Sequence, residues 1–441
     1  MTTVAGADYD VVVIGGGPAG AVAGRQAAQL GLRVLLVEKD AFPRFHIGES
    51  LLPYMTGLLN QLGLLEEMRH QGHPIKAGAE FTNTDGMFHR VCFTDQGPGR
   101  FHTTFQVDRS RFDQVLLDSA AEAGVTVRTQ SEVSNIDLRD DDSPHAVTFT
   151  GPEGMAETAT GTILIDASGR AGLVSNRLGL RKPVERLKMV ALYRHYAGVR
   201  EEDNPGWRGD VQIGNHKDGW IWAIPNTAGM LSVGAVMRKS TLRGADDREA
   251  LLTEHIGRVP RIVERLGRAR SQGPARVETD FCYFADQVVG NRWFTVGDSA
   301  AFVDPVFSGG VYLAMTTGMQ ASIEAAKILG GASTVEESKE RFTSLYKTGY
   351  DTYFRLVQGF YEYEFDFGKF KSDLPDSVDD KSVSLLLGGD FWGQANTFAA
   401  ELRSVERWNL FEPFDVHYGC PAYPELEFSE RNAAPVPSGA L

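Results

Sequence analysis

Cysteine is scarce in this chain, whose 441 residues contain only Cys92, Cys282 and Cys420. An odd number of widely separated cysteines gives neither a disulfide framework nor the paired spacing of a zinc site. We therefore expect no bound metal and a reducing, cytoplasmic location. No stretch reaches the roughly 18 apolar residues of a membrane span. The polar opening MTTVAGAD also lacks the basic and apolar regions of a signal peptide.

Positive charge is also in deficit. The chain has 44 Lys and Arg against 58 Asp and Glu, a net charge of -14. Such a protein is a poor partner for the phosphate backbone of nucleic acids or for an anionic lipid surface, and we expect neither. Hydrophobic residues make up 42% of the chain and charged residues 23%, as in a globular protein with a sizeable core. The length predicts closely joined domains rather than one small module.

Glycine is the residue in excess, with 48 copies, and its first cluster carries a motif. The β-branched run at 9–14 predicts a buried strand, the alanine-rich stretch 18–30 a helix, and 33–38 a second strand. Between the first strand and the helix stands GxGxxG, whose glycines let a pyrophosphate approach the helix N-terminus. An acidic residue ending the second strand can accept ribose hydroxyls. The predicted dinucleotide contacts are Gly15, Gly17, Ala19, Gly20 and Glu38.

The rest of the chain alternates between two patterns. A helix at 106–124, strands at 125–128, 162–166 and 294–296, and a long helix at 310–329 continue the α/β pattern. Short alternating strands between 190 and 289 are typical of an antiparallel sheet. We predict a discontinuous dinucleotide-binding domain, an inserted substrate-side sheet and a C-terminal mainly helical region with a loose tail from about 430. The expected boundaries are 1–75, 105–185 and 285–335 for the first, 76–104 and 186–284 for the second, and 336–441 for the third.

The bound dinucleotide is predicted to be FAD rather than NAD. The βαβ unit at the N-terminus and a second loop, Gly297-Asp298, suggest one dinucleotide held by distant segments. An NAD dehydrogenase would continue with further parallel strands, whereas here the loop 42–50 and the antiparallel sheet intervene. Because the chain has no second GxGxxG, we expect a separate flavin reductase to supply FADH2.

The sequence resembles the glutathione-reductase-like flavoproteins, a group that includes aromatic hydroxylases and flavin-dependent halogenases. The shared elements are 15–20 with Glu38, Arg109 before Phe112-Asp113, the segment 166–169, and Gly297-Asp298. The resemblance implies a Rossmann-like FAD-binding domain of the hydroxylase and halogenase type. It also implies that FAD is contacted by Arg109, by Asp298, and by Arg44 and Ser50 of the loop 42–50.

A tryptophan motif distinguishes members of this group. The segment 219–225 matches WxWxIP, the signature associated with flavin-dependent halogenases, through Trp220, Trp222, Ile224 and Pro225. Two indoles on one face of a strand can narrow the space near the flavin so that a halide, but no organic substrate, reaches the activated oxygen. The alternative is that both tryptophans are core aromatics of one strand.

A second halogenase motif, FxxPxxSxG, spans 302–310 and ends in Ser308, Gly309 and Gly310. Successive backbone N–H groups in such a turn before a helix form a small anion site. The resemblance places the halide, chloride or bromide, at the N–H groups of Gly309 and Gly310. Tryptophan halogenases carry Ser or Thr where Gly309 stands and Glu where Phe307 stands. In these departures the chain is similar to the phenol and pyrrole halogenases.

A lysine, Lys76, completes the proposed catalytic machinery. A single lysine is ordinarily a solvated charge, but its place after the helical stretch 58–69 matches the catalytic lysine of the phenol-type halogenases. The resemblance implies that FADH2 and O2 form a flavin hydroperoxide and that halide attacks it to give hypohalous acid. Lys76 then donates a hydrogen bond to that acid, or becomes a haloamine, and directs the halogen to an electron-rich ring.

Two features bear on substrate and partner. The first is an aromatic row at helical spacing, explained by core packing or by a phenol-sized pocket wall: Tyr346, Tyr350, Tyr353, Val357, Phe360 and Tyr361. The second is the arginine-rich stretch 258–276, in which Arg261, Arg265 and Arg268 share a helical face. It is either a solvated face or a dock for an acidic acyl or peptidyl carrier protein.

The sequence therefore predicts a flavin-dependent halogenase of the phenol or pyrrole type, an enzyme of secondary metabolism such as antibiotic biosynthesis. Its substrate is an electron-rich aromatic ring, free or tethered to a carrier protein. One alternative is a flavin-dependent aromatic hydroxylase, which needs an open path from flavin to ring. The other is a flavin-binding protein without turnover.

Overall fold

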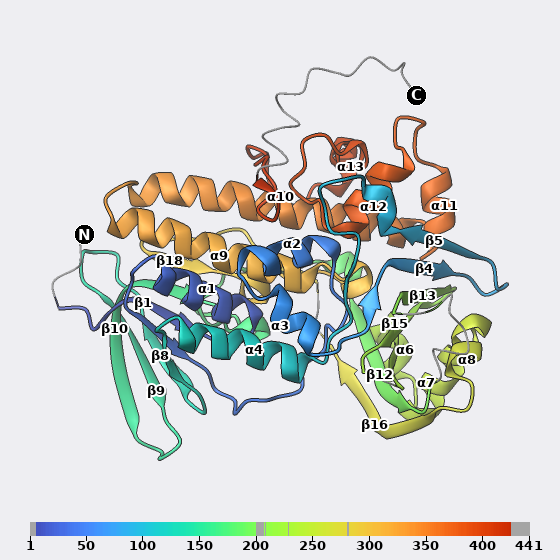
Figure 1. Cartoon of the computed structure of the whole chain (residues 1–441), viewed down its shortest axis with the longest axis horizontal. Coiled ribbons are helices and arrows are strands. Elements are labelled where there is room, and N and C mark those ends of the chain that lie inside the picture. Colours follow the sequence, from blue (N-terminus) through green and yellow to red (C-terminus); the bar gives the residue numbers. More distant parts are fainter. Residues whose placement is uncertain (1–5, 200–206, 208, 228, 280–281, 425–441) are drawn as a thin grey trace.

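The computed structural model describes residues 6–199, 207, 209–227, 229–279 and 282–424. Two large sheets lie next to each other, with helices packed on both (Figure 1). This mixed α/β architecture with an inserted sheet is the one that the sequence predicts. The loose tail expected from about residue 430 lies outside the described residues.

The first sheet has seven strands, in the order β7-β2-β1-β10-β9-β8 with β18 beside β10. The central strands β1, β2 and β10 run parallel and are buried on both faces, as continuous β-branched sequence favours. Ile14 stands opposite both Val37 and Asp166, so the carboxyl ends of the three strands meet at one edge. The strands span Tyr9–Ile14 (β1), Val34–Val37 (β2), Thr126–Arg128 (β7), Glu132–Asp137 (β8), His145–Thr150 (β9), Ala156–Asp166 (β10) and Trp293–Thr295 (β18).

Three helices pack together beside this sheet: α1 (Pro18–Gln29), α4 (Arg109–Glu122) and α9 (Gly310–Leu329). Small residues permit the close approach of α1 and α9, because a Cβ at Gly318 would stand 2.3 Å from the carbonyl oxygen of Ala19. The contact fixes the start of α9 next to the glycine turn that precedes α1. Shorter helices nearby are α2 (Pro53–Gln61), α3 (Leu65–His70) and α5 (Leu173–Arg177).

The second sheet has the order β16-β12-β15-β14-β13-β4-β5. We expected an antiparallel sheet, but β4 and β13 pair in parallel, since β4 comes from an early segment that joins the sheet at the free side of β13. The other neighbouring pairs are antiparallel. The strands span Gly78–Thr82 (β4), Phe88–Cys92 (β5), Met189–Ala197 (β12), Val211–His216 (β13), Gly219–Pro225 (β14), Met230–Arg238 (β15) and Arg270–Glu278 (β16).

Side chains alternate between the two faces of this sheet. Ile221 and Ala223 of β14 face α7 and α8, whereas Trp220 and Trp222 belong to the main core on the opposite side. The helices beside this sheet are α6 (Lys239–Arg243), α7 (Arg248–Gly257) and α8 (Pro260–Leu266). The indoles of β14 consequently point away from α7 and α8 and toward the first sheet.

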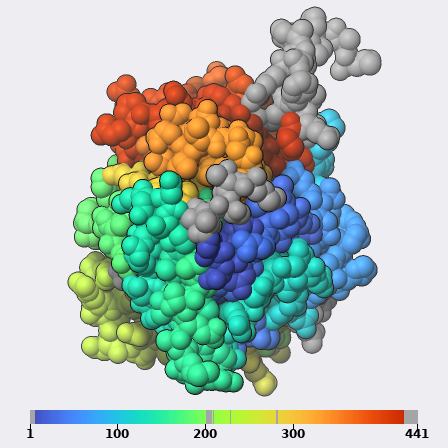
Figure 2. Space-filling model, turned by 90° about the vertical axis from the view of Figure 1, so that its left-hand side faces the viewer, coloured from blue at the N-terminus to red at the C-terminus, as the bar shows by residue number. Residues whose placement is uncertain are grey.

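The described C-terminal residues form a layer along one side of the molecule (Figure 2), and Figure 1 shows that this layer is mainly helical. Its long helix α10 (Val335–Glu362) runs beside α9, and α11 (Phe367–Ser372), α12 (Asp380–Gly388) and α13 (Thr397–Ser404) follow. The structure also describes two small two-stranded sheets. One pairs β3 (Ile75–Lys76) with β6 (Thr104–Phe105), and the other pairs β11 (Arg181–Pro183) with β17 (Tyr283–Ala285). Among the helices that the structure describes, none has the length and apolar character needed to span a bilayer.

A buried histidine pair on the second sheet gives a stability prediction. The Nε2 of His216 lies 3.1 Å from the Nδ1 of His255, and the N–H of Asp218 donates to the Nδ1 of His216. Burial, with a contribution from His255 and Arg258, lowers the pKa of His216 to about 3. Because the unfolded chain takes up the proton near pH 6.5, the free energy of unfolding falls as the pH falls below that value, by up to about 1.4 kcal/mol per pH unit.

His216→Asn should flatten this dependence, since an amide has no proton to take up in the same range. The measurement is urea unfolding at several pH values between 7 and 5. Because His255 is bonded to His216, the substitution changes the titration of both, and the difference between the two slopes reports the histidine pair. Equal slopes for the wild type and the variant would contradict the assignment.

Candidate functional site

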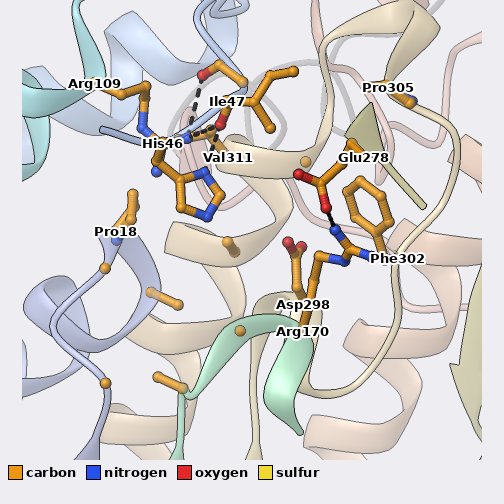
Figure 3. A pocket seen from close by; sticks show the side chains of 18 of the residues that line it. Pro18, His46, Ile47, Arg109, Arg170, Glu278, Asp298, Phe302, Pro305 and Val311 are labelled. Carbon is orange, nitrogen blue, oxygen red and sulfur yellow. Dashed lines mark hydrogen bonds and ion pairs between the residues drawn. The ribbon is translucent and has the colours of Figure 1, made fainter. Parts of the chain in front are cut away.

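A cavity of about 480 Å³ lies between the carboxyl edge of the first sheet and the inner face of the second. Figure 3 shows Pro18, His46 and Arg109 on one side, and Arg170, Glu278, Asp298 and Phe302 on the other. The cavity joins segments far apart in sequence. The predicted site residues that line it are Gly15, Gly17, Ala19, Glu38, Arg44, Ser50, Arg109, Trp220, Trp222, Ile224, Asp298, Ser308 and Gly310.

The glycine turn between β1 and α1 forms one end of the cavity. Gly15 has a φ of +103°, and a Cβ there would stand 2.3 Å from the carbonyl oxygen of Ala167. A Cβ at Gly20 would stand 1.9 Å from the carbonyl oxygen of Gly15. Only glycine fits these two positions, and the turn consequently opens the N-terminus of α1 to the cavity.

Glu38 holds the turn from the end of β2. Its carboxylate accepts the N–H of Gly16 at 2.6 Å and that of Asp40 at 2.7 Å. The side chain is 4% exposed and lines the cavity. Each carboxylate oxygen can accept a second hydrogen bond, so Glu38 can fix the turn and bind ribose hydroxyls at the same time.

Two arginines share one buried carboxylate on the cavity wall. Arg109 donates to both oxygens of Asp113, at 2.7 and 2.9 Å, and Arg44 donates to one of them at 3.1 Å. Asp113 is fully buried. Arg44 also lies 3.7 Å from Asp40. The two guanidinium groups place N–H donors beside the glycine turn, which suits the pyrophosphate of a dinucleotide. His46 lies close by, and its burial, aided by the charge of Arg109, lowers its pKa to about 4.

Asp298 faces the cavity from the loop after β18 (Figure 3). Burial raises the pKa of its carboxyl to about 6, against the opposing effect of Arg170, Arg109 and Arg181. Arg170 also pairs with Glu278, and this ion pair joins the end of β10 to the end of β16 beside the cavity. Asp298, Arg170 and Glu278 therefore give this side of the cavity a polar lining.

The tryptophan motif forms the wall of the cavity on the side of the second sheet. Trp220 and Trp222 are 2% and 5% exposed, with ring centroids 5.9 Å apart. The indole N–H of Trp222 donates to the hydroxyl of Ser232. Ile224 lines the same wall, and Pro225 ends β14 opposite Leu231. The two indoles are buried, as core aromatics are, and they also face the cavity, as the halogenase motif predicts.

Lys76 lies behind the cavity wall rather than on it. Its ammonium donates to the hydroxyl of Ser50 at 2.9 Å and to the carbonyl oxygen of Leu51 at 2.8 Å, and it lies 5.6 Å from the ring centre of Phe93. The side chain is 1% exposed. Burial, opposed by Asp210, lowers its pKa to about 7. Ser50, predicted as a cofactor contact, lines the cavity, and its side chain stands between the cavity and Lys76.

The glycine turn before α9 supplies the proposed anion site. Ser308 has a φ of +60°, and both Ser308 and Gly310 line the cavity. The N–H of Gly310 stands at the first helical position, where α-helices leave N–H groups unpaired. The N–H of Gly309, in contrast, donates to the hydroxyl of Tyr353 at 3.3 Å. This bond could not be predicted from the sequence, because Tyr353 comes from α10.

Several buried polar groups near the cavity were not foreseen. Glu49 accepts hydrogen bonds from His195 at 2.7 Å and Asn226 at 2.5 Å, joining the loop 42–50 to the second sheet. Asp304 is fully buried and bonded to Tyr361. Glu49 lies within the loop 42–50 and Asp304 within the motif 302–310, and both segments had been assigned other roles. In the part of the chain that the structure describes, no cluster of three or more His, Cys, Asp or Glu could hold a metal ion.

The arginines of 258–276 are mostly engaged within the protein. Arg258 pairs with Asp218 and Glu254, and Arg261 pairs with Glu80. Arg265 is 4% exposed and donates to backbone carbonyl oxygens. These three side chains therefore offer little to an acidic carrier protein. The aromatic row of α10 is buried from Tyr346 to Phe360, and core packing explains it.

The model of a family described as FAD binding domain matches residues 8–338. Its extent covers the glycine turn, Glu38, the paired arginines and Asp298. The fold and the site therefore define an FAD-binding flavoprotein, and the residues lining the cavity fit that cofactor.

Comparison with known proteins narrows this class. A flavin-dependent halogenase of Armillaria mellea is 34% identical over 378 residues, 80% of this chain and 74% of the relative. A 1H-pyrrole-2-carbonyl-[peptidyl-carrier protein] chlorinase of Pseudomonas fluorescens is 29% identical over 419 residues, 87% and 90% of the two chains. A solved flavin-dependent brominase superposes with a TM-score of 0.80 at 29% identity, covering 90% of this chain and 98% of its own. The chain belongs to the flavin-dependent halogenases and is an oxidoreductase enzyme.

Proposed function

We propose that this enzyme halogenates an electron-rich aromatic ring, a phenol or a pyrrole, with a buried lysine directing hypohalous acid to the ring. The observation that carries the proposal is the position of Lys76, one side chain away from a cavity lined by both motif tryptophans. The similar pyrrole chlorinase acts on a ring held by a carrier protein. We infer that a carrier-bound pyrrole is among the substrates to test first.

The cofactor would be held by residues already at the cavity. The turn of Gly15 and Gly17, which packs against Gly20, would receive the pyrophosphate, Glu38 the ribose, and the remaining contacts would come from Arg44, Arg109 and Asp298. When bound, reduced FAD would activate O2, and O2 would be the oxidant that converts chloride or bromide to hypohalous acid, with oxidised FAD and water as the other products. We infer that a separate reductase provides the reduced flavin, since the chain carries a single GxGxxG.

The protein's own groups then act on the acid and the ring. The indoles of Trp220 and Trp222 occupy the cavity wall and keep an aromatic substrate away from the flavin. The ammonium of Lys76 donates a hydrogen bond to the oxygen of the acid and polarises its bond to the halogen. As the carbon–halogen bond forms, the oxygen leaves as water, and the ring loses a proton in exchange for the one gained by the oxygen.

The test uses purified protein with FADH2, O2 and chloride or bromide. Phenols, pyrroles and carrier-bound pyrrole-2-carboxyl groups are the substrates, and mass spectrometry identifies the products. A halogenated ring is expected. A hydroxylated ring without halogen would contradict the proposal and favour an aromatic hydroxylase. Bound FAD with no consumption of O2 would instead favour a protein without turnover.

The anion site is tested separately through Gly310→Ala. A Cβ at Gly310 meets no other protein atom within 4 Å, so the fold should tolerate it. The methyl group would stand at the cavity wall beside the proposed halide, and we expect the chloride KM to rise about tenfold, or 1.4 kcal/mol. Steady-state halogenation at varied chloride gives this value. An unchanged chloride KM would place the halide away from this turn.

A further inference from the structure

Asp304 stands at the start of the turn proposed to bind halide, yet it faces away from the cavity. Its neighbours Val303 and Pro305 line the cavity, whereas its own side chain is fully buried. One carboxyl oxygen accepts the N–H of Val306 at 3.1 Å and caps the short 3-10 helix Pro305–Phe307. The carboxyl group is therefore attached directly to the backbone of the turn.

Two tyrosines of α10 hold the same turn at both ends. The hydroxyl of Tyr361 donates to the second carboxyl oxygen of Asp304 at 2.5 Å. The hydroxyl of Tyr353 donates to the carbonyl oxygen of Asp304 at 2.9 Å and accepts the N–H of Gly309 at 3.3 Å. The turn is thereby fixed from behind by side chains that do not line the cavity.

Among the residues that the structure describes, no cation faces the Asp304 carboxyl. The groups that face it are Tyr361 and Tyr353 of α10, Trp220 of β14 and Cys282 beside β17. Burial raises the pKa of Asp304 to about 7, and hydrogen bonds from Tyr361, Val306 and Trp220 act in the opposite direction. A buried carboxylate without a cation is costly, and next to a bound anion it would be costlier still.

We propose that Asp304 is a positioning residue for the halide turn and that it holds the turn in its uncharged, protonated form when a halide is bound. The inference rests on the halide site proposed above at Ser308 and Gly310. With a neutral carboxyl the bond from the N–H of Val306 is kept, whereas the bond to Tyr361 reverses: the carboxyl O–H donates to the oxygen of Tyr361. The turn can then keep its shape without repelling the anion.

Proton and halide binding must be linked if this assignment is right. Below pH 7 the carboxyl already carries its proton and the chloride affinity is constant. Above pH 7 a proton has to be taken up with each chloride, so the dissociation constant of chloride should rise, approaching about tenfold per pH unit. The halide in turn raises the pKa of Asp304.

The experiment measures chloride binding to the FAD-loaded protein by chlorine NMR line broadening between pH 6 and 8.5. Asp304→Asn keeps an acceptor for the N–H of Val306 and has no charge at any pH, so it should lose the part of the pH dependence that comes from Asp304 and keep only the part that comes from the other titrating groups. Tyr361→Phe removes a hydrogen bond that lowers the pKa of Asp304. The pH above which chloride affinity begins to fall should therefore be higher in this variant. Lys76 and Asp298 titrate in all three proteins.

The outcomes separate this inference from the proposed halide site. If Asp304→Asn keeps the wild-type pH dependence while Gly310→Ala weakens chloride binding, the halide site stands and the role of the Asp304 proton is overturned. A uniform loss of affinity at every pH in Asp304→Asn would show a structural role alone and overturn it as well. If Gly310→Ala leaves chloride affinity unchanged, the proposed halide site is wrong, and the inference about Asp304 that rests on it is rejected as well.

Discussion

Replacing Lys76 with methionine should abolish halogenation while leaving the oxidation of FADH2 by O2 intact. Methionine has a similar length, no charge and suits a site that is 1% exposed, so the fold should be kept. The loss of one proton donor at the reacting group lowers rates by at least about 100-fold. The measurement compares halogenated product with FADH2 consumed in the same reaction. Undiminished halogenation in the variant would remove Lys76 from the mechanism.

The pH dependence of the wild type distinguishes the two forms of the lysine. Because burial lowers the pKa of Lys76 to about 7, the ammonium is replaced by the neutral amine as the pH rises through 7. At a chloride concentration that saturates the enzyme at every pH, halogenation should decline above pH 7 if the ammonium is the active form, and increase if a haloamine is. Lys369→Met, at a side chain 64% exposed, serves as the control and should behave as the wild type.

Gly15→Ala should eliminate FAD binding. Its backbone has a φ of +103°, and the new Cβ would overlap the carbonyl oxygen of Ala167 at 2.3 Å, so the turn between β1 and α1 must move. We expect FAD affinity to fall at least about 100-fold, or 2.7 kcal/mol, and the free energy of unfolding to fall by about 3 kcal/mol. Flavin fluorescence titration and urea unfolding measure the two effects.

A matched control separates backbone strain from the loss of the pocket. Gly31 has a φ of +84°, and a Cβ there meets no other protein atom within 4 Å. Gly31→Ala therefore carries the conformational strain without the collision, and it lies outside the cavity. It should lose some stability and retain FAD. Equal loss of FAD binding in both variants would mean that Gly15 acts through stability alone.

Local sequence determined much of the fold. Tyr9–Ile14 and Gly310–Leu329 form the strand and helix that were predicted, because β-branched runs and helical periodicity act within one element. The alternation of Trp220 and Trp222 also placed both on one face correctly. The parallel pairing of β4 with β13 was not predicted, since periodicity indicates that a strand exists and does not indicate its neighbour.

Sequence motifs identified residues that the structure brings to one cavity, but they did not identify the hydrogen-bond partners of those residues. The residues of the two motifs were found in sequence, and most of them line one cavity. Two features depend on contacts between distant segments and could not be predicted. The hydroxyl of Tyr353 accepts the N–H of Gly309, and Ser50 separates Lys76 from the cavity. The arginines of 258–276 were similarly visible as charges, while the carboxylates and carbonyl oxygens that engage them were not.

The parallel contact between β4 and β13 has a consequence for how the chain folds. During synthesis, residues 78–82 cannot pair with residues 211–216 until the latter have been made, and much of the first sheet is synthesised before that point. A contact of such sequence separation forms slowly and leaves the edge of β4 unpaired until then. The second sheet is therefore not a contiguous module. An exchange of substrate specificity between relatives would have to transplant both of its segments together.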